Sequence, residues 1–441
     1  MRRSPKGDRE IGILIYATDG DGIGGRLKVR AEDFVVNEIS EIETGEKGDY
    51  IIVEVRKVNW DTHILVKNIA KKLRISKHRI SFAGTKDKFA VTTQKMSIKG
   101  VYEEDIRRIR IKDVDIRVLG RARRHVYLGD LIGNDFDIVV RDVSLPADEI
   151  RRRIDRIYDE IGEIGGFPNF FGVQRFGAVR PLTHIVGKHI LRGNVREAVM
   201  CYLTDIFEGE SDAAKEARRT ASEDFKSALN AMPLSLKYER AMLDVLIKRG
   251  CTQPEDCTDD DFIAALRVLP LHLRKMFVHA YQAYLFNLVL SKRIERGIPL
   301  NSAEIGEFVC FTDRYGLPSL NGEKVERVTA DNEGMINMLL KRRRAFVVAP
   351  LFGHESVLSG GIQGEIEREV LNAEKISTSD FLVEKIPELR SEGHFRSIAV
   401  HVNIERVDIG DDELYGDKKV RFKFFLPKAS YATVVMREFM K

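Results

Sequence analysis

Residues 420–427, VRFKFFLP, alternate apolar and polar side chains near the C-terminal end of the chain. Val420, Phe422, Phe424 and Leu426 therefore share one face of a predicted β-strand. The preceding stretch 397–409, SIAVHVNIERVDI, alternates in the same way and predicts another strand. These two strands need partners to bury their apolar faces, and the nearest strand patterns lie in the first third of the chain.

That first third mixes strands with helices. Strand patterns occur at 27–39 (LKVRAEDFVVNEI), 49–58 (DYIIVEVRKV), 79–84 (RISFAG) and 135–144 (DFDIVVRDVS). A helix is predicted over 61–76, with Asp61 or Thr62 as its N-cap, and another over 146–162, where isoleucines recur on one side. Strands at both ends of the chain predict one sheet built from both termini.

The middle of the chain is different in character. Its strongest pattern is a helix over 271–297, with Leu273, Phe277, Ala280, Tyr284 and Leu288 on one face and Gly297 after its end. We therefore predict an α+β protein with a mixed or antiparallel sheet. One domain comprises 1–194 and 391–441, and an α/β insertion domain comprises 195–390.

Composition sets broad limits on function. The chain has 441 residues, with 72 Lys+Arg against 68 Asp+Glu and a net charge of +4, so any site for a polyanion depends on clustering. Basic clusters occur at 71–79, 107–112, 121–124, 151–153 and 341–344, mostly before residue 155. Each is either a solvated surface or part of a nucleic-acid surface.

Cysteine and histidine spacing predicts neither a disulfide framework nor a metal site. The four cysteines form no C-x-x-C pair, and His272 and His279 lack a third ligand. We expect a cytoplasmic protein, because there is no signal-peptide pattern and no apolar run long enough to cross a bilayer.

The stretch GDGIGGR (20–26) contains G-x-G-x-x-G, which would be the only support for a dinucleotide-dependent oxidoreductase. A dinucleotide site needs a helix directly after the glycines, but a strand pattern follows. We interpret the glycines as a turn, and we expect no cofactor.

Asp87 lies in FAGTKDKFAVTTQ (82–94), on the turn after a short strand. The cations Lys86 and Lys88 beside it favour the ionised carboxylate, which suits a nucleophile or a base. The alternative is an aspartate that closes a turn by bonding to backbone N–H groups. Local chemistry leaves both open.

The stretch NFFGVQRFG (169–177) gathers aromatic rings, an amide and a guanidinium within nine residues. Such a set can stack on and hydrogen-bond to a flipped base. It can equally be a buried strand pair with glycine turns. Together with the basic clusters, the first interpretation predicts an RNA ligand.

These two motifs resemble a known family. FAGTKDKFAVTTQ resembles the G-x-K-D-x-x-A-x-T-x-Q signature of the TruD tRNA pseudouridine synthases, and NFFGVQRFG resembles their N-x-F-G-x-Q-R-F-G. LKVRAEDFVVNEI, HAYQAYLFNLVLSKR and FFLPKASYATVVMRE are similar to further segments of that family, so the resemblance spans nearly the whole chain. It implies a pseudouridine synthase catalytic domain interrupted by a TruD-type insertion.

The resemblance also implies roles for particular residues. Asp87 falls on the catalytic aspartate and Lys28 on the basic residue that pairs with it. Phe171 matches the aromatic that stacks on the target uracil, and Asn169 the amide beside it. The implied substrate-binding residues are Asn169, Phe171, Gln174, Arg175, Leu426 and Tyr431, although Tyr431 stands where some members have Phe.

We therefore expect an isomerase that converts a uridine of tRNA, at position 13 of the D arm by resemblance, to pseudouridine. The expected partner is tRNA, the expected state is a monomer, and no metal, small-molecule cofactor or membrane is expected. The alternative from another class is a non-catalytic tRNA-binding protein or RNA chaperone, which would have no use for Asp87.

Overall fold

The predicted C-terminal strand lies inside a large sheet. In the computed structural model, which describes residues 2–320 and 325–441, β14 (Lys418–Pro427) pairs antiparallel with β13 and β6. The sheet runs in the order β13-β14-β6-β1-β4-β2-β5, with β3 paired to β4. Its other strands are β1 (Phe34–Ser40), β2 (Tyr50–Val58), β3 (Ile80–Phe82), β4 (Val91–Lys99), β5 (Val114–Ala122), β6 (Leu131–Val143) and β13 (Ile404–Asp411).

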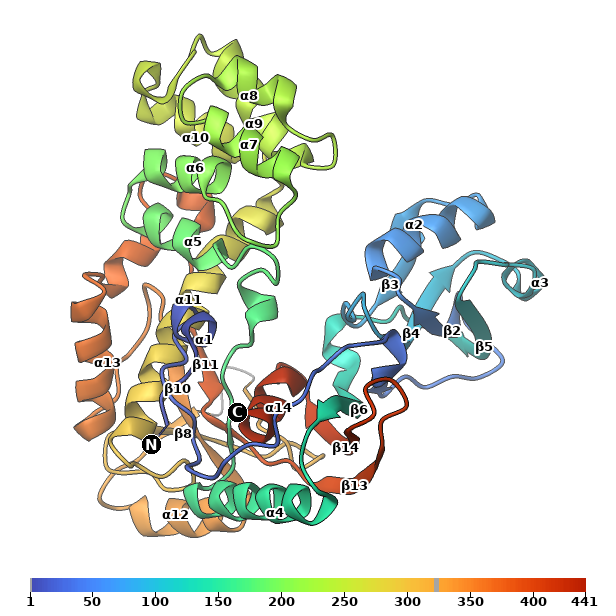
Figure 1. Cartoon of the computed structure of the whole chain (residues 1–441), viewed down its shortest axis with the longest axis vertical. Coiled ribbons are helices and arrows are strands. Elements are labelled where there is room, and N and C mark those ends of the chain that lie inside the picture. The colour runs from blue at the N-terminus through green and yellow to red at the C-terminus, as the bar shows by residue number, and fades with distance from the viewer. Residues whose placement is uncertain (1, 321–324) are drawn as a thin grey trace. The chain divides into compact units, whose positions relative to one another are not determined.

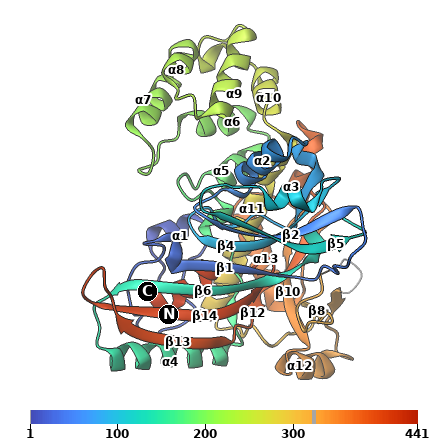
Figure 2. The same ribbon diagram turned by 90° about the vertical axis from the view of Figure 1, so that its right-hand side faces the viewer.

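Figure 2 shows β13, β14, β6 and β1 side by side. The pairing of β1 with β4 is parallel, whereas the neighbouring pairs are antiparallel. The sheet is thus mixed and draws strands from both ends of the chain. This arrangement confirms the predicted α+β fold class.

The chain divides into two compact units, described here one at a time. The sheet unit comprises Gly20–Glu163 and Val400–Lys441, and the helical unit comprises Met1–Asp19 and Ile164–Ala399. These limits differ from the predicted domain boundaries at 194/195 and 390/391. The division into a catalytic domain and an insertion domain stays a prediction.

Helices cover the sheet unit where the sequence periodicity places apolar side chains. Asp61 is the N-cap of α2 and accepts a hydrogen bond from the backbone N–H of Ile64 at 2.9 Å. Leu65 and Ile69 of that helix are fully buried in a cluster with Val53 and Val55 of β2. The helices of this unit are α2 (Thr62–Leu73), α3 (Glu103–Arg107), α4 (Ala147–Ile164) and α14 (Ala432–Met440), with short 3₁₀ turns η1 (Ala31–Asp33), η2 (Lys77–Arg79) and η3 (Leu128–Asp130).

The glycines at 20–25 lie in irregular backbone that leads to a 3₁₀ turn and a strand, so no helix follows them. Close packing explains two of them. A Cβ on Gly22 would lie 2.5 Å from the backbone nitrogen of Lys441, and one on Gly25 would lie 2.7 Å from the carbonyl oxygen of Arg141.

The helical unit is built around α11 (Leu271–Glu295). Figure 1 shows α7 to α10 together at one end of this unit and α12, β8 and β10 at the other. Its other elements are α1 (Lys6–Glu10), α5 (Thr183–Leu191), α6 (Val195–Thr204), α7 (Asp212–Thr220), α8 (Phe225–Ala231), α9 (Lys237–Lys248), α10 (Asp259–Arg267), α12 (Glu333–Lys341), α13 (Gly361–Ala373), β7 (Phe167–Pro168), β8 (Phe308–Phe311), β9 (Val325–Arg327), β10 (Ala345–Leu351), β11 (His394–Ser397), β12 (Ala399–Val400), and the 3₁₀ turns η4 (Val173–Arg175), η5 (Pro254–Asp256), η6 (Thr378–Leu382) and η7 (Pro387–Leu389).

The single apolar face predicted for α11 is too narrow. Phe277 and Ala280 of that face are buried, but so are Val278, Tyr281 and Leu285 on other sides of the helix. A helix packed by neighbours on several sides needs no polar face. The sequence pattern therefore showed one part of a wider contact surface.

Two predicted strands are wrong in extent. The strand predicted at 27–39 begins only at Phe34, because 31–33 form the turn η1 and Lys28 has a left-handed backbone with φ of +55°. The strand predicted at 397–409 is broken into β11, β12 and β13. The chain passes from the helical unit to the sheet unit within that stretch, between Ala399 and Val400.

Candidate active site

Asp87 lies in the loop 83–90 between β3 and β4, and several hydrogen bonds hold this loop, among them that from the backbone N–H of Asn59 to the carbonyl of Ala90 at 3.2 Å. The Gln94 side chain donates to the carbonyl of Gly84 at 3.1 Å, and the backbone N–H of Lys86 donates to the Thr62 hydroxyl at 3.2 Å. The Lys57 ammonium donates to the carbonyl of Asp87 itself at 2.9 Å. The loop is thus bonded to β4, α2 and β2.

The Asp87 carboxylate forms an ion pair with Lys28. Their Oδ2 and Nζ atoms are 3.3 Å apart, and the two side chains are 33% and 25% exposed, so both remain open to a ligand. The Lys28 ammonium also lies 4.1 Å from the centre of the Phe34 ring, within cation–π range. Its left-handed backbone, uncommon for a residue with a Cβ, is a strained conformation of the kind found at functional sites.

Lys86, expected beside the Asp87 carboxylate, has a different partner. Its ammonium donates to Glu38 at 2.7 Å, and both side chains of this pair are almost completely buried. Lys88 is exposed. The cation bonded to the Asp87 carboxylate is therefore Lys28, distant in sequence, and the expectation that Lys86 accompanies this carboxylate was wrong.

Leu426 lies in the same sheet, on a row of paired residues that crosses three strands. Leu426 of β14 is opposite Asn134 of β6, which is opposite Glu38 of β1. Leu426 is fully buried, so it belongs to the core of the sheet unit. Tyr431, which precedes α14, is half-buried.

The other predicted residues lie in the helical unit, around the buried side chain of Arg396. Its guanidinium donates to the backbone oxygen of Asn169 at 3.0 Å and to the Asn169 side-chain oxygen at 2.8 Å. The same group lies 3.9 Å from the centre of the Phe171 ring. Phe171 is 7% exposed, and the edge-to-face ring of Phe286 is 5.7 Å from it. Arg396 therefore holds both side chains.

Asn287 of α11 fixes the backbone beside Phe171. Its side-chain oxygen accepts from the Phe171 N–H at 2.8 Å, and its side-chain nitrogen donates to the Phe171 carbonyl at 3.0 Å and to that of Ile11 at 2.9 Å. Of the other rings in the motif, Phe170 and Phe176 are fully buried. The motif is thus partly core, but the strand pair of the second interpretation is wrong, because 169–172 are irregular and 173–175 form the turn η4.

Gln174 and Arg175 lie on η4, immediately after Phe171. Gln174 is exposed and Arg175 is half-buried, with its guanidinium carbon 5.7 Å from the centre of the Phe171 ring. The structure thus brings together Lys28 with Asp87 in the sheet unit, and Asn169 with Phe171 and Arg175 in the helical unit.

Three residues of these groups were missed by the sequence interpretation. Lys57 carried a signal, since alternation places it on the same face of β2 as the buried Val53 and Val55. Burial lowers the pKa of Lys57 to about 8, with Lys86 adding to the shift and Asp61 and Asp87 opposing it. Arg396 and Asn287 carried no local signal, because their partners are remote in sequence.

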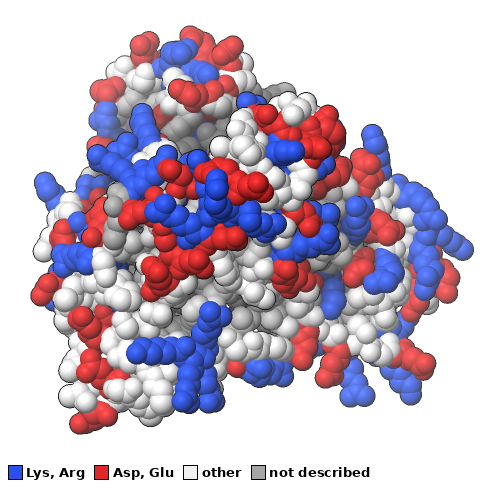
Figure 3. Space-filling model, turned by 60° about the horizontal axis from the view of Figure 1, so that its bottom comes forward, with Lys and Arg blue, Asp and Glu red and all other residues white. Residues whose placement is uncertain are grey.

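Charge is unevenly distributed along the sheet unit. Figure 3 shows basic and acidic side chains interspersed over much of the face in view. From residue 62 to residue 86, however, the sequence contains no acid. The exposed basic residues of this segment are His63, Lys67, Lys71, Lys72, Arg74, Lys77 and His78. Such a surface can bind phosphates.

In the part of the chain that the structure describes, no cluster of three or more His, Cys, Asp or Glu side chains is arranged to hold a metal ion. None of the helices there is both long and apolar enough to span a membrane.

Comparison with known proteins gives one consistent result. Residues 10–439 match the family model described as tRNA pseudouridine synthase D (TruD). Relatives named "Probable tRNA pseudouridine synthase D" include that of Methanosarcina barkeri, 44% identical over 99% of this chain and 98% of its own length, and that of Pyrococcus abyssi, 38% identical over 97% and 99%. The crystal structure of a Methanosarcina mazei protein titled "Putative tRNA pseudouridine synthase D (TruD)" matches 99% of this chain and 98% of its own, with a TM-score of 0.84 and 45% identity.

Proposed function

Because the chain belongs to the tRNA pseudouridine synthase D (TruD) family, we propose that it converts a uridine of tRNA to pseudouridine. The reaction breaks the bond between ribose C1′ and uracil N1, turns the base, and joins C1′ to C5. The hydrogen on C5 leaves as a proton and N1 gains one. Nothing is oxidised, and no group comes from another molecule.

The observation that carries this proposal is the 3.3 Å ion pair between Lys28 and Asp87 on an anchored loop. We assign to Asp87 the attack or deprotonation of the first step, at the ribose or at the base. Lys28, the ion-pair partner of this carboxylate, is assigned to direct it. Both side chains are partly exposed, as groups that meet a substrate must be.

Phe171 is assigned the stacking of the detached uracil, which is worth about 1–3 kcal/mol per base. Asn169 is assigned to the base edge, Gln174 and Arg175 to the flanking nucleotide, and the half-buried Tyr431 to the pocket wall. Leu426, expected in that wall, has no exposed surface and can only support it from within. The rigid contacts of Arg396 with Asn169 and Phe171 support these roles, because a platform that holds a loose ring must itself be fixed.

The target is assigned by family as uridine 13 in the D arm. The uridine must leave its stack to be reached, and the acid-free segment 62–86 offers cations for the surrounding phosphates. The protein is proposed to act on tRNA as a monomer.

Tritium release from tRNA labelled at uracil C5 tests the activity. Formation of pseudouridine must expel this hydrogen, whereas binding leaves it in place. We expect release by the natural protein and none above background by Asp87→Asn. Asp137→Asn is the matched control, since Asp137 is another ion-paired aspartate of the sheet unit, bonded to Arg421. It should release label at the natural rate.

A natural protein that binds tRNA but releases no label would instead be the non-catalytic binder. Equal release by Asp87→Asn would remove Asp87 from its role and leave the activity intact. Mapping pseudouridine in the product, with a U13C transcript beside the natural one, tests the position: modification elsewhere would refute the assignment to uridine 13.

A further inference from the structure

Lys57 is a lysine with no exposed surface, near the end of a strand that is paired on both sides. It lies on β2, where its strand neighbours are Thr92 of β4 and Val114 of β5, and its exposed fraction is 0%. Its side chain lies on the same face of β2 as Val53 and Val55, both fully buried. A charge in such surroundings costs free energy unless it is bonded.

The Lys57 ammonium is bonded to two backbone carbonyls. It donates to Trp60 at 2.6 Å and to Asp87 at 2.9 Å. Among the described residues no carboxylate lies within ion-pair distance of it, so its bonds are to peptide groups alone. Lys57 therefore joins the turn after β2 to the loop of the candidate active site.

The bond from Lys57 is made to a different residue of the loop from those that Gln94 and Thr62 contact. Gln94 and Thr62 bond to Gly84 and to Lys86, whereas Lys57 bonds to the peptide of Asp87 itself. From that residue the carboxylate extends to Lys28, 3.3 Å away. A shift of this peptide would move the carboxylate directly.

We propose that Lys57 is a positioning residue for the isomerisation proposed above, on which this inference rests: its buried ammonium fixes the peptide that carries the Asp87 carboxylate. Lys57 does not touch the substrate, because it has no exposed surface. It acts by keeping the carboxylate where the uridine arrives, and a misplacement of about 1 Å can cost about 10²-fold in rate.

The test replaces Lys57 by Met, which keeps the length of the stem and removes the donor. Lys95→Met is the matched control, since Lys95 of the adjacent strand β4 also donates to one backbone carbonyl, that of Ser40 at 2.8 Å, away from the loop. Three quantities are measured for each protein: the single-turnover rate of tritium release, the Kd for tRNA, and the thermal midpoint.

We expect Lys57→Met to lower the single-turnover rate about 10²-fold while the Kd for tRNA stays within threefold, on the order of 0.7 kcal/mol. Lys95→Met should leave both unchanged. A purely structural role would lower the thermal midpoint and leave the rate of the folded fraction unaltered. Lys57→Gln carries a neutral amide with a shorter reach, so its single-turnover rate should lie between those of the natural protein and Lys57→Met. It replaces Lys57→Met in the test if that variant does not fold.

A single-turnover rate within threefold of the natural protein for both folded variants would overturn the inference while the proposed function stands. A weakened tRNA affinity with a normal rate would also overturn it. If the natural protein itself released no label, the proposed function would fall, and the inference with it.

Discussion

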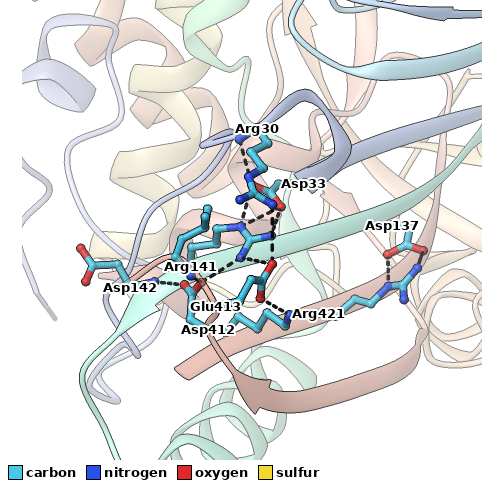
Figure 4. A network of polar contacts seen from close by, with 10 residues as sticks. Arg30, Asp33, Asp137, Arg141, Asp142, Asp412, Glu413 and Arg421 are labelled. Atoms are coloured by element: carbon cyan, nitrogen blue, oxygen red, sulfur yellow. Dashed lines mark hydrogen bonds and ion pairs between the residues drawn. The ribbon is translucent and has the colours of Figure 1, made fainter. Parts of the chain in front are cut away.

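Arg141 forms a buried ion-pair network at the end of β6, and its removal should destabilise the sheet unit strongly. Its guanidinium donates to Asp33 at 2.8 Å, to Asp412 at 2.8 Å and to Glu413 at 3.1 Å (Figure 4). The side chains of Asp33 and Asp412 are 2% and 0% exposed. Three segments remote in sequence therefore depend on one cation.

Arg141→Met keeps much of the apolar stem and removes every donor. The carboxylates of Asp33 and Asp412 then lie buried without their cation, and breaking a buried pair from one side costs about 3–5 kcal/mol. The matched control is Arg421→Met. Arg421 pairs with Asp137 in the same view, but its side chain is 47% exposed, so about 0–1 kcal/mol is expected.

Urea denaturation followed by tryptophan fluorescence measures both values. Trp60 is the only tryptophan of the chain and belongs to the sheet unit, so its emission reports the unfolding of that unit. A free energy of unfolding for Arg141→Met within about 1 kcal/mol of that for Arg421→Met would refute the reasoning, because buried and exposed pairs would then be equivalent.

Two further predictions concern the helical unit. Burial lowers the pKa of His184 from 6.5 to about 4, so between these two pH values the unfolded chain binds a proton that the folded chain does not. The contribution of His184 to the free energy of unfolding is therefore complete above pH 6.5 and falls by up to about 3 kcal/mol as the pH drops towards 4. Urea denaturation followed by circular dichroism at pH 7 and pH 4.5 should show a smaller loss for His184→Gln than for the natural protein, and an equal loss would contradict this cause. Asn287→Leu leaves the N–H and carbonyl of Phe171 without their partner, and each such group costs about 1–3 kcal/mol. An unchanged free energy of unfolding in the same assay would show that other groups satisfy them.

Local sequence patterns correctly predicted the elements whose apolar side chains recur with the period of a helix or a strand. The isoleucines of α4 and the alternating apolar side chains of β14 are buried as expected, because apolar residues that recur with the period of the element share one face, and that face packs against the core. The start of β1 was missed although Asp33 caps η1 locally by accepting from the Arg30 N–H at 2.9 Å; the bond from Arg141 to the same carboxylate spans 108 residues. A window of a dozen residues contains no trace of such a bond.

In the candidate site, too, local sequence patterns did not predict contacts between residues distant in sequence. The sequence pointed to Asp87 through its loop and to Lys28 through a family motif. It also placed Lys86 beside the carboxylate, although Lys86 turns to Glu38 in the interior. Arg396 was invisible, because its contact with Asn169 joins residues 227 apart. Adjacency in sequence was thus a poor guide to which cation meets which acid.

Besides the exposed Lys88, three lysines lie on or contact the loop of Asp87, and each of the three has a different bonding partner. Lys86 is neutralised by the buried Glu38, and Lys57 is bonded to carbonyls, so neither ammonium is available to a ligand. Lys28 alone of the three pairs with the Asp87 carboxylate and keeps exposed surface. Loss of Lys57 or Lys86 should therefore alter where the carboxylate lies, whereas loss of Lys28 alters the charge that it faces.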